Sequence, residues 1–245
     1  MSLCPPPHRA MILAAGRGTR LASLTATTPK PLIRAGGHAL IDLALQQLQA
    51  AGVREYVVNT HHLAERVEDH VRRWPVSCLH LSRERDLLET GGGVARALRW
   101  LGLTPFYVLN SDVIWLDPPG RSLLRLAEAW QDDRMDVLLL LAPTVKAQGY
   151  DGRGDFTMQP DGRLVRRPAS TLAPFVFTGA QILSPRAFVD APAGAFSLNR
   201  IYDRAAERGR LYGLRFEGDW IDAGTPERLH LASEALLHAR QGTLW

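Results

Sequence analysis

A short glycine loop near the start of the chain has the composition of a phosphate-binding site. Gly16 and Gly18 follow an apolar run, and glycines at such a place let several backbone N–H groups converge on one anion. Arg20 adds a fork-shaped guanidinium that matches phosphate oxygens. Lys30 stands between two prolines, which stiffen the backbone that carries its ammonium. These four residues together predict a site for a phosphate-bearing ligand.

The loop matches neither of the two common phosphate-binding fingerprints. No Gly-Lys-Ser/Thr sequence follows at the spacing of a Walker A loop. The pattern from Gly16 to Gly18 lacks the third glycine of a dinucleotide-binding turn, and a long loop follows where that turn would begin a helix. The loop is therefore predicted to bind phosphate without being either a Walker A loop or a dinucleotide-binding turn.

The charge of the chain is mildly basic and is carried almost entirely by arginine. Its 245 residues include 29 Lys and Arg against 25 Asp and Glu, and Lys30 and Lys146 are the only lysines. A coding bias toward Arg accounts for the excess of Arg over Lys. A lysine that is present despite this bias is informative, because lysine and arginine side chains bind anions differently. Lys146 has no motif around it and is expected at the surface. Acidic and basic residues are interspersed throughout, so the pI near 9.4 does not indicate nucleic-acid binding.

Apolar runs alternate with helical patterns over the first 142 residues. Strands are predicted at residues 10–15, 55–60, 76–81, 106–109 and 137–141, helices at 40–51, 63–74, 94–101 and 122–131, and a long loop at 16–36. This alternation predicts an α/β fold, namely a mostly parallel, doubly wound, Rossmann-like sheet with helices on both faces. Right-handed crossovers bring the C-terminal ends of the strands to one edge, where ligands bind in such sheets.

The texture changes after about residue 143, where a small antiparallel layer is expected over the ligand-binding edge. Residues 149–154 form a glycine-rich loop, and residues 155–158 and 164–166 flank a Pro-Asp-Gly turn. Further strands are predicted at 175–183, 211–216 and 220–222, with helices at 196–209 and 227–239. No linker separates the halves. Residues 1–9 are interpreted as an irregular leader and residues 10–245 as one domain with halves at 10–142 and 143–245.

The cysteines and the apolar segments indicate a location in the cytoplasm. Cys4 and Cys78 are too few for a disulfide framework and lie in no zinc-binding pattern. The first ten residues lack the apolar core of a signal peptide, and the apolar run at 137–142 is too short to cross a bilayer. We therefore expect a reduced, cytoplasmic protein with no membrane and no nucleic-acid partner.

Residues 11–32 resemble the signature of the sugar-1-phosphate nucleotidylyltransferases, and five further motifs follow in that family's order. They are Glu89-Thr90-Gly91-Gly92-Gly93, Asn110-Ser111-Asp112, Gly152-Arg153-Gly154-Asp155-Phe156, Phe177-Thr178-Gly179 and Trp220-Ile221-Asp222-Ala223-Gly224-Thr225. The resemblance implies the nucleotide-diphospho-sugar transferase fold, with residues 10–142 binding a nucleotide and residues 143–245 a sugar. It also implies a reaction of an NTP with a sugar 1-phosphate that releases pyrophosphate, in which the protein positions two anions and neutralises their charge.

The resemblance assigns roles to individual residues. Arg20, Lys30 and Asp112 are implied as catalytic, with Arg20 facing the leaving pyrophosphate and Lys30 at the reacting phosphates. Asp112 and Asp222 match the family's ligands for Mg²⁺, a cofactor suited to oxygen ligands. The nucleotide is implied to contact Ala14, Ala15, Gly16, Gly18, Thr19, Glu89, Thr90, Gly91 and Gly92. The sugar is implied to contact Asn110, Gly154, Asp155, Thr178, Gly179 and Asn199.

Two arginines depart from the pattern of several hexose-1-phosphate relatives. Those relatives carry Glu-Lys-Pro where this chain has Arg166-Arg167-Pro168. Arg167 is able to bind the sugar phosphate, but Arg166 cannot accept hydrogen bonds from sugar hydroxyls, because a guanidinium only donates. Arg166 would instead suit a carboxylate on the sugar, such as the lactyl group of N-acetylmuramate. The alternative interpretation is that both arginines lie on an exposed hairpin.

The short chain and the Glu-Thr-Gly-Gly-Gly and Gly-Arg-Gly-Asp-Phe runs favour particular substrates within the family. They resemble the corresponding features of relatives that use UTP and N-acetylmuramate α-1-phosphate, and this resemblance implies the same substrates and a role in bacterial cell-wall recycling. A guanylyltransferase for mannose or heptose 1-phosphate is the alternative enzyme, and a regulatory nucleotide-sugar-binding domain is the alternative without catalysis. No hexapeptide repeat follows residue 239, so a monomer or simple dimer is expected.

Overall fold

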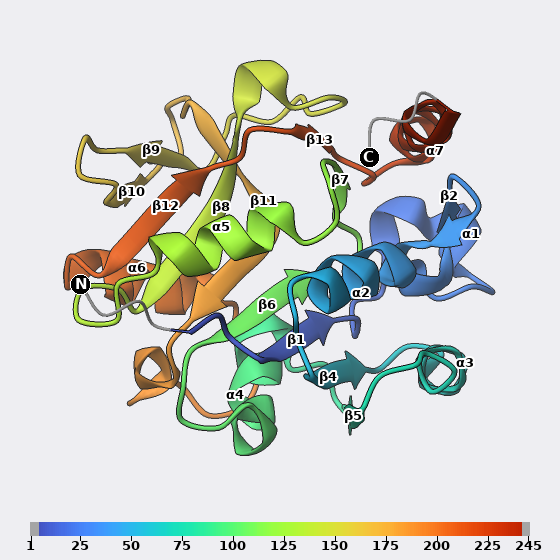
Figure 1. Ribbon diagram of the computed structural model, residues 1–245, viewed down its shortest axis with the longest axis horizontal. Helices are drawn as coiled ribbons and strands as arrows, with labels where there is room; N and C mark the ends of the chain where they lie inside the picture. Colours follow the sequence, from blue (N-terminus) through green and yellow to red (C-terminus); the bar gives the residue numbers. More distant parts are fainter. Residues whose placement is uncertain (1–4, 242–245) are drawn as a thin grey trace.

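Nine strands form one sheet in the computed structural model, which describes residues 5–241 apart from the side chains of residues 20, 22, 23, 240 and 241 (Figure 1). The sheet contains β1 (Arg9–Leu13), β4 (Glu55–Thr60), β5 (Cys78–Arg83), β6 (Phe106–Asn110), β8 (Val137–Pro143), β9 (Phe156–Met158), β10 (Leu164–Arg166), β11 (Phe175–Leu183) and β12 (Leu211–Arg215). Its main path runs β10-β9-β11-β6-β1-β4-β5, and β8 pairs with β11 and β12. Cys4 and most of the predicted leader lie outside the described residues.

The centre of the sheet is parallel, as the alternating pattern predicted. β6, β1, β4 and β5 run in one direction, with Ile12 opposite Val58 in one pair and Leu109 in the other. β11 is antiparallel to both β6 and β8 and so joins the two halves of the chain in one sheet. The C-terminal ends of β1, β4 and β6 therefore meet at one edge of the sheet.

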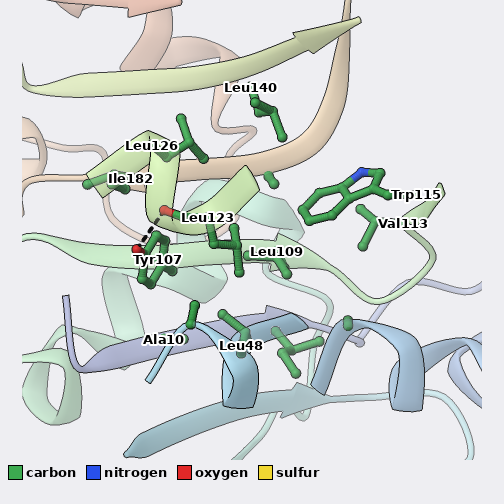
Figure 2. Close-up of a cluster of buried hydrophobic side chains, with 14 of the residues drawn as sticks. Ala10, Leu48, Tyr107, Leu109, Val113, Trp115, Leu123, Leu126, Leu140 and Ile182 are labelled. Atoms are coloured by element: carbon green, nitrogen blue, oxygen red, sulfur yellow. Dashed lines mark hydrogen bonds between the residues drawn. The ribbon is translucent and has the colours of Figure 1, made fainter. Parts of the chain in front are cut away.

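Helices cover both faces of the sheet because successive strand residues point to opposite sides. Ala10 and Ile12 belong to one buried cluster, whereas Met11 between them belongs to the other. The first cluster includes residues of α2 (Leu40–Ala50), α3 (Ala64–Val71) and α5 (Arg121–Ala129), and the second includes residues of α4 (Glu89–Leu101) and α6 (Asn199–Glu207). Figure 2 shows part of the first cluster, in which the Tyr107 hydroxyl donates a hydrogen bond of 2.8 Å to the carbonyl of Leu123.

Two further sheets contain two short strands each. β7 (Ile114–Leu116) pairs antiparallel with β13 (Asp219–Ile221), and β2 (Arg34–Ala35) pairs with β3 (His38–Ala39). The C-terminal helix α7 (Pro226–Gln241) packs against β2 and β7. Their apolar side chains form a third cluster that includes Leu21, Ile114 and Ile221. This cluster brings α7 beside Leu21, which follows the glycine loop.

The predicted elements differ from the structure at several places. The predicted loop at residues 16–36 contains the 3-10 turns η1 (Thr19–Leu21) and η2 (Lys30–Leu32), the helix α1 (Ala22–Thr25) and the strand β2. The helix predicted to begin at residue 94 begins at Glu89, because tertiary packing overrides the low helix propensity of three glycines. β7 was not predicted, since three residues are too few to show periodicity. The structure also contains η3 (Thr144–Lys146) and η4 (Pro185–Phe188).

None of the described helices combines the length and the apolar character that crossing a membrane requires.

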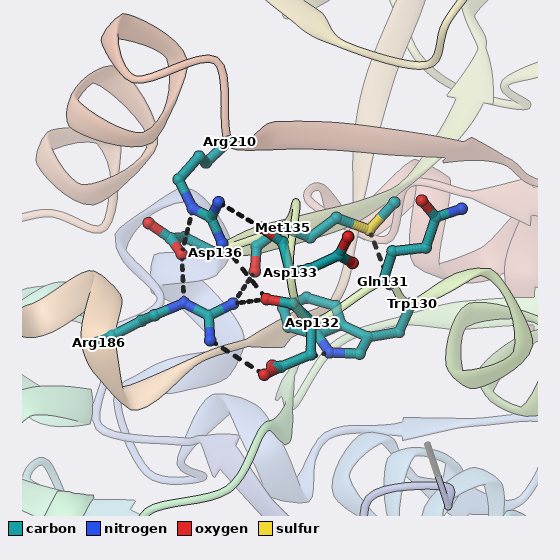
Figure 3. Close-up of polar contacts among 8 residues, drawn as sticks. All are labelled: Trp130, Gln131, Asp132, Asp133, Met135, Asp136, Arg186 and Arg210. Atoms are coloured by element: carbon teal, nitrogen blue, oxygen red, sulfur yellow. Dashed lines mark hydrogen bonds and ion pairs between the residues drawn. The ribbon is translucent and has the colours of Figure 1, made fainter. Parts of the chain in front are cut away.

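Asp136 and two arginines join three strands at the edge of the sheet opposite to the C-terminal ends of β1, β4 and β6 (Figure 3). Asp136, at the start of β8, is buried and accepts hydrogen bonds from Nε of Arg186 at 2.6 Å and Nε of Arg210 at 2.8 Å. The backbone adds to this link, because the Asp136 carbonyl accepts from the Ser184 amide and the Asp136 amide donates to the Arg210 carbonyl. The ends of β8, β11 and β12 are thus joined at one side chain.

Asp136→Ala is expected to destabilise the fold by about 2 kcal/mol, because it leaves two arginines without their shared buried acceptor. The effect stays below the range for fully buried pairs since both arginines reach solvent. The urea midpoint and Tm measure the change. Asp132→Ala is the matched control, since that exposed carboxylate makes a surface ion pair with Arg186 and a longer hydrogen bond of 3.3 Å from Nε1 of Trp130, and it should cost less than about 1 kcal/mol. Equal losses in the two variants would contradict the role given to Asp136.

Candidate active site

Two cavities lie side by side at the C-terminal edge of the parallel strands. The first has a volume of about 440 Å³ and the second about 330 Å³. Asn110 and Asp112 line both of them. A ligand in either cavity therefore reaches the same carboxylate, which is the arrangement that a reaction between two bound molecules requires.

The glycine loop forms one wall of the first cavity, through Ala14, Ala15, Gly16, Gly18 and Thr19. Gly18 has a φ of +64°, and a Cβ there would stand 2.8 Å from Cγ2 of Thr25 and 3.0 Å from Cβ of Lys30. Only glycine allows this left-handed, closely packed turn. Arg20 lies in η1, and its side chain is outside the described part of the chain.

Lys30 and Asp112 form an ion pair at the boundary between the cavities. The ammonium of Lys30 donates to Oδ2 of Asp112, and the two side chains are 14% and 27% exposed. Lys30 begins η2, with the extended Pro29 before it and the buried Pro31 after it. The structure thus brings together the lysine and the aspartate that the sequence placed 82 residues apart.

A buried network behind the first cavity was not predicted from the sequence. Oδ1 of Asn59 accepts from the Ala14 amide at 2.8 Å, and Nδ2 of Asn59 donates to Oε1 of Glu84 at 2.7 Å. The second oxygen of Glu84 accepts from the Leu88 amide at 2.9 Å, just before α4. These bonds fix the glycine loop relative to α4. Asn59 is the penultimate residue of β4 and Glu84 follows β5, so a polar residue near a strand end was the available signal.

Gly93→Ala is expected to disturb this network and to raise the KM for the nucleotide about 10-fold. A Cβ at Gly93 would lie 2.9 Å from Nδ2 of Asn59 and 3.0 Å from Oε1 of Glu84, so one of these buried groups must shift. Steady-state kinetics with varied nucleotide measure the effect. Arg96→Ala, on an exposed position of the same helix, is the control. An unchanged KM for Gly93→Ala would show that the network does not set the width of the cavity.

The Glu-Thr-Gly-Gly-Gly run divides between the cavity and the core. Glu89 and Thr90 line the first cavity, whereas Gly91 and Gly92 are buried behind it. The amides of both glycines donate to the Phe196 carbonyl, at 2.8 and 3.0 Å. A Cβ on Gly91 would lie 2.4 Å from the ring of Phe196. These glycines thus allow a close approach of the segment before α6, and their amides already donate to a backbone carbonyl.

Four of the residues expected to bind the sugar line the second cavity, namely Asn110, Asp155, Thr178 and Gly179. Asp155 is oriented by the Phe177 amide, which donates to its Oδ2 at 2.9 Å. Two aromatic residues that the sequence analysis had not assigned, Tyr150 and Trp220, form another wall, with ring centroids 6.0 Å apart in an edge-on arrangement. Burial raises the pKa of the Tyr150 hydroxyl above its ordinary value.

The remaining sugar-binding candidates do not line either cavity. Gly154 is buried, and its amide donates to the Tyr150 hydroxyl at 3.0 Å. Arg167 donates to the carbonyls of Gly154, Pro168, Ala169 and Thr171 and so holds its own turn. Arg166 is exposed and pairs with Asp203 at 2.7 Å, so binding a sugar carboxylate would require that pair to open. Asn199 is exposed at the start of α6.

Asp222 joins Asp112 on the wall of the second cavity. The pairing of Ile221 with Ile114 causes this, since Asp222 follows β13 and Asp112 precedes β7. Oδ1 of Asp222 accepts from the Gly224 amide at 2.9 Å, and Oδ2 pairs with Arg228 at 2.5 Å. Among residues 5–241 no group of three His, Cys, Asp or Glu is placed to hold a metal. Two carboxylates at one cavity nevertheless suit Mg²⁺, which keeps waters and takes its other ligands from phosphates.

Sequence comparison relates nearly the whole chain to known enzymes. The family model described as "Nucleotidyl transferase" matches residues 9–239. An N-acetylmuramate alpha-1-phosphate uridylyltransferase of Caulobacter vibrioides is 42% identical over 236 residues, which are 94% of this chain and 97% of the relative. A protein of the same name from Neisseria meningitidis serogroup B is 34% identical, over 90% of this chain and 95% of its own. A mannose-1-phosphate guanylyltransferase catalytic subunit beta of Danio rerio is 30% identical over 89% of this chain and 62% of its own.

Solved structures share the fold. The inositol-1-phosphate CTP transferase of T. maritima superposes with a TM-score of 0.80 and 17% identity, covering 98% of each chain. A UDP-glucose pyrophosphorylase complexed with UDP-glucose has a TM-score of 0.75 and 19% identity, over 93% of this chain and 97% of its own. The predicted nucleotide-diphospho-sugar transferase fold is confirmed.

Proposed function

Because the chain is an enzyme of the nucleotidyl transferase family, we propose that it transfers UMP from UTP to N-acetylmuramate α-1-phosphate. An oxygen of the sugar phosphate attacks the α-phosphorus of the NTP, the bond from that phosphorus to the bridging oxygen breaks, and pyrophosphate leaves. The two cavities that share Asn110 and Asp112 carry this proposal. They let two anions approach one point, with the NTP in the first cavity and the sugar phosphate in the second.

The side chains at the shared boundary supply what the transfer needs. The Lys30 ammonium lies on the wall of the first cavity beside the shared Asp112, where it would contact phosphate oxygens of the NTP and follow the negative charge as it moves toward the leaving group. Asp112 and Asp222 would hold Mg²⁺, which neutralises phosphate charge when it is bound. Tyr150 and Trp220 offer apolar surface to a sugar ring, and Asp155 offers an acceptor to its hydroxyls.

The choice of substrates rests on the two uridylyltransferase relatives, which match this chain over nearly their full lengths. The guanylyltransferase relative has a lower sequence identity, and the match covers only 62% of its length. Lys30, Asp112 and Asp222 are all present, which favours an enzyme over a regulatory binding domain. A role in cell-wall recycling follows from the proposed substrates. The cytoplasmic location and the monomeric or simple dimeric state stay predictions from the sequence.

The direct test is pyrophosphate release across the four NTPs, each combined with a panel of sugar 1-phosphates. UTP with N-acetylmuramate α-1-phosphate is expected to give a kcat/KM at least about 10-fold above every other pair. A preference for GTP with mannose or heptose 1-phosphate would replace the proposed substrates and keep the chemistry. No turnover with any pair, by a protein that binds nucleotide sugars, would favour the regulatory alternative.

A further inference from the structure

Arg228 connects two parts of the second cavity that the sequence keeps far apart. It lies in the first turns of α7, and its side chain is 16% exposed. One guanidinium nitrogen, Nη1, pairs with Oδ2 of Asp222 at 2.5 Å, and the other, Nη2, pairs with Oδ1 of Asp151 at 2.6 Å. Asp222 is a wall of the cavity, whereas Asp151 belongs to the loop of residues 148–154 and is 87% exposed. No role for Arg228 was expected from the sequence.

The loop of residues 148–154 carries Tyr150, one of the two aromatic residues on the wall of the second cavity. Its first residue is held beside β13, because the Gln148 amide donates to the Trp220 carbonyl at 3.1 Å and the Asp222 amide donates to the Gln148 carbonyl at 3.2 Å. The middle of the loop is supported by the Arg228 side chain. A Cβ on Gly149 would lie 3.3 Å from Cγ of Arg228, so the loop backbone packs directly on the stem of this arginine. The Asp151 pair then holds the loop beyond Tyr150.

The carboxylate of Asp222 is held at both of its oxygens. The Gly224 amide donates to Oδ1, and Arg228 donates to Oδ2. Rotation of the carboxylate about its last bond would break one of these hydrogen bonds, so its orientation is fixed before any ligand arrives. Each oxygen keeps a further lone pair for a cation or a donor in the cavity. A single guanidinium thus sets this orientation and anchors the loop.

We propose that Arg228 is a positioning residue that sets the Asp222 carboxylate and the Tyr150 wall of the second cavity together. This rests on the proposed function, in which that cavity binds the sugar 1-phosphate. The planar fork of arginine suits the task because it offers separate N–H groups to two carboxylates, whereas a lysine ammonium is a single point charge. Positioning of Asp222 acts on kcat, and anchoring of the loop acts on the affinity for the sugar phosphate.

Three variants separate these two actions. Asp151→Asn weakens the loop contact alone and should raise the KM for the sugar 1-phosphate about 5-fold, with kcat and the KM for NTP within about twofold of wild type. Arg228→Met removes both contacts and should also lower kcat about 50-fold. Arg228→Lys should recover part of kcat, through Asp222, without recovering the KM. An unchanged kcat in Arg228→Met, or an effect of Asp151→Asn on the NTP instead of the sugar phosphate, overturns the proposal.

Limited trypsin digestion of the protein without substrates or divalent cations gives a readout that is independent of turnover. Arg153 is exposed within the loop, and cleavage after it reports how firmly the loop is held. Asp151→Asn and Arg228→Met should both be cut there about 5-fold faster than wild type, with unchanged cleavage after the exposed Arg85 outside the loop. Wild-type rates at Arg153 in both variants would overturn the proposal. A wild-type protein without turnover would instead refute the proposed function, while the digestion still tests the hold of Arg228 on the loop.

Discussion

Lys30→Arg is expected to lower kcat about 100-fold although it keeps the positive charge. The lysine stem packs directly on the glycine loop, since a Cβ on Gly18 would lie 3.0 Å from Cβ and 3.4 Å from Cδ of Lys30. Its ammonium reaches Asp112 at the boundary of both cavities. A guanidinium is wider and planar, so in this packed setting it would displace either the loop or the carboxylate. The loss should therefore appear in kcat measured by pyrophosphate release.

Lys146→Arg is the matched control for this prediction. Lys146 is the only other lysine in the chain and is exposed in η3, away from both cavities. The same chemical change there should leave kcat within about twofold, because no packed contact is altered. Near wild-type kcat for Lys30→Arg would mean that only the charge matters at this position. It would also remove the reason for treating the retained lysine as functional.

Asp112→Asn is expected to lower kcat more than about 1,000-fold while the protein stays folded. The variant keeps the shape of the side chain but removes the charge that pairs with Lys30 and that a divalent cation would require. Folding should be preserved because Asp112 is partly exposed and its carboxylate makes its ion pair at the cavity boundary rather than in a core. Steady-state turnover and the thermal transition are measured together.

Two comparisons sharpen the Asp112 experiment. Asp69→Asn removes an exposed carboxylate from α3 and should leave turnover unchanged. Binding of Mn²⁺ together with a non-hydrolysable NTP analogue, followed by electron paramagnetic resonance, should weaken in Asp112→Asn at least about 10-fold. Turnover that survives both Asp112→Asn and removal of divalent cations with EDTA would contradict the metal role given to Asp112 and Asp222.

Local patterns in the sequence predicted the central architecture and the family. The strands at the centre of the sheet are short apolar runs buried on both faces, so their composition reveals them without knowledge of their partners. The glycine loop with Lys30 and the motifs at Asp112 and Asp222 are contiguous groups of residues with distinctive spacing. The residues of these motifs that line the cavities could therefore be predicted from the sequence.

The tertiary structure decided which residues meet. Asp222 comes beside Asp112 only through the ribbon of β7 and β13, whose strands have three residues each and show no periodic pattern. The buried link between Asn59 and Glu84 joins the ends of neighbouring strands. Gly91 and Gly92 of α4 are explained by their close approach to the segment that contains Phe196. Arg166 and Arg167 turned out to be paired with Asp203 and with backbone carbonyls. Element type follows from local pattern, whereas a side chain's partner depends on the packing of distant segments, which no local pattern encodes.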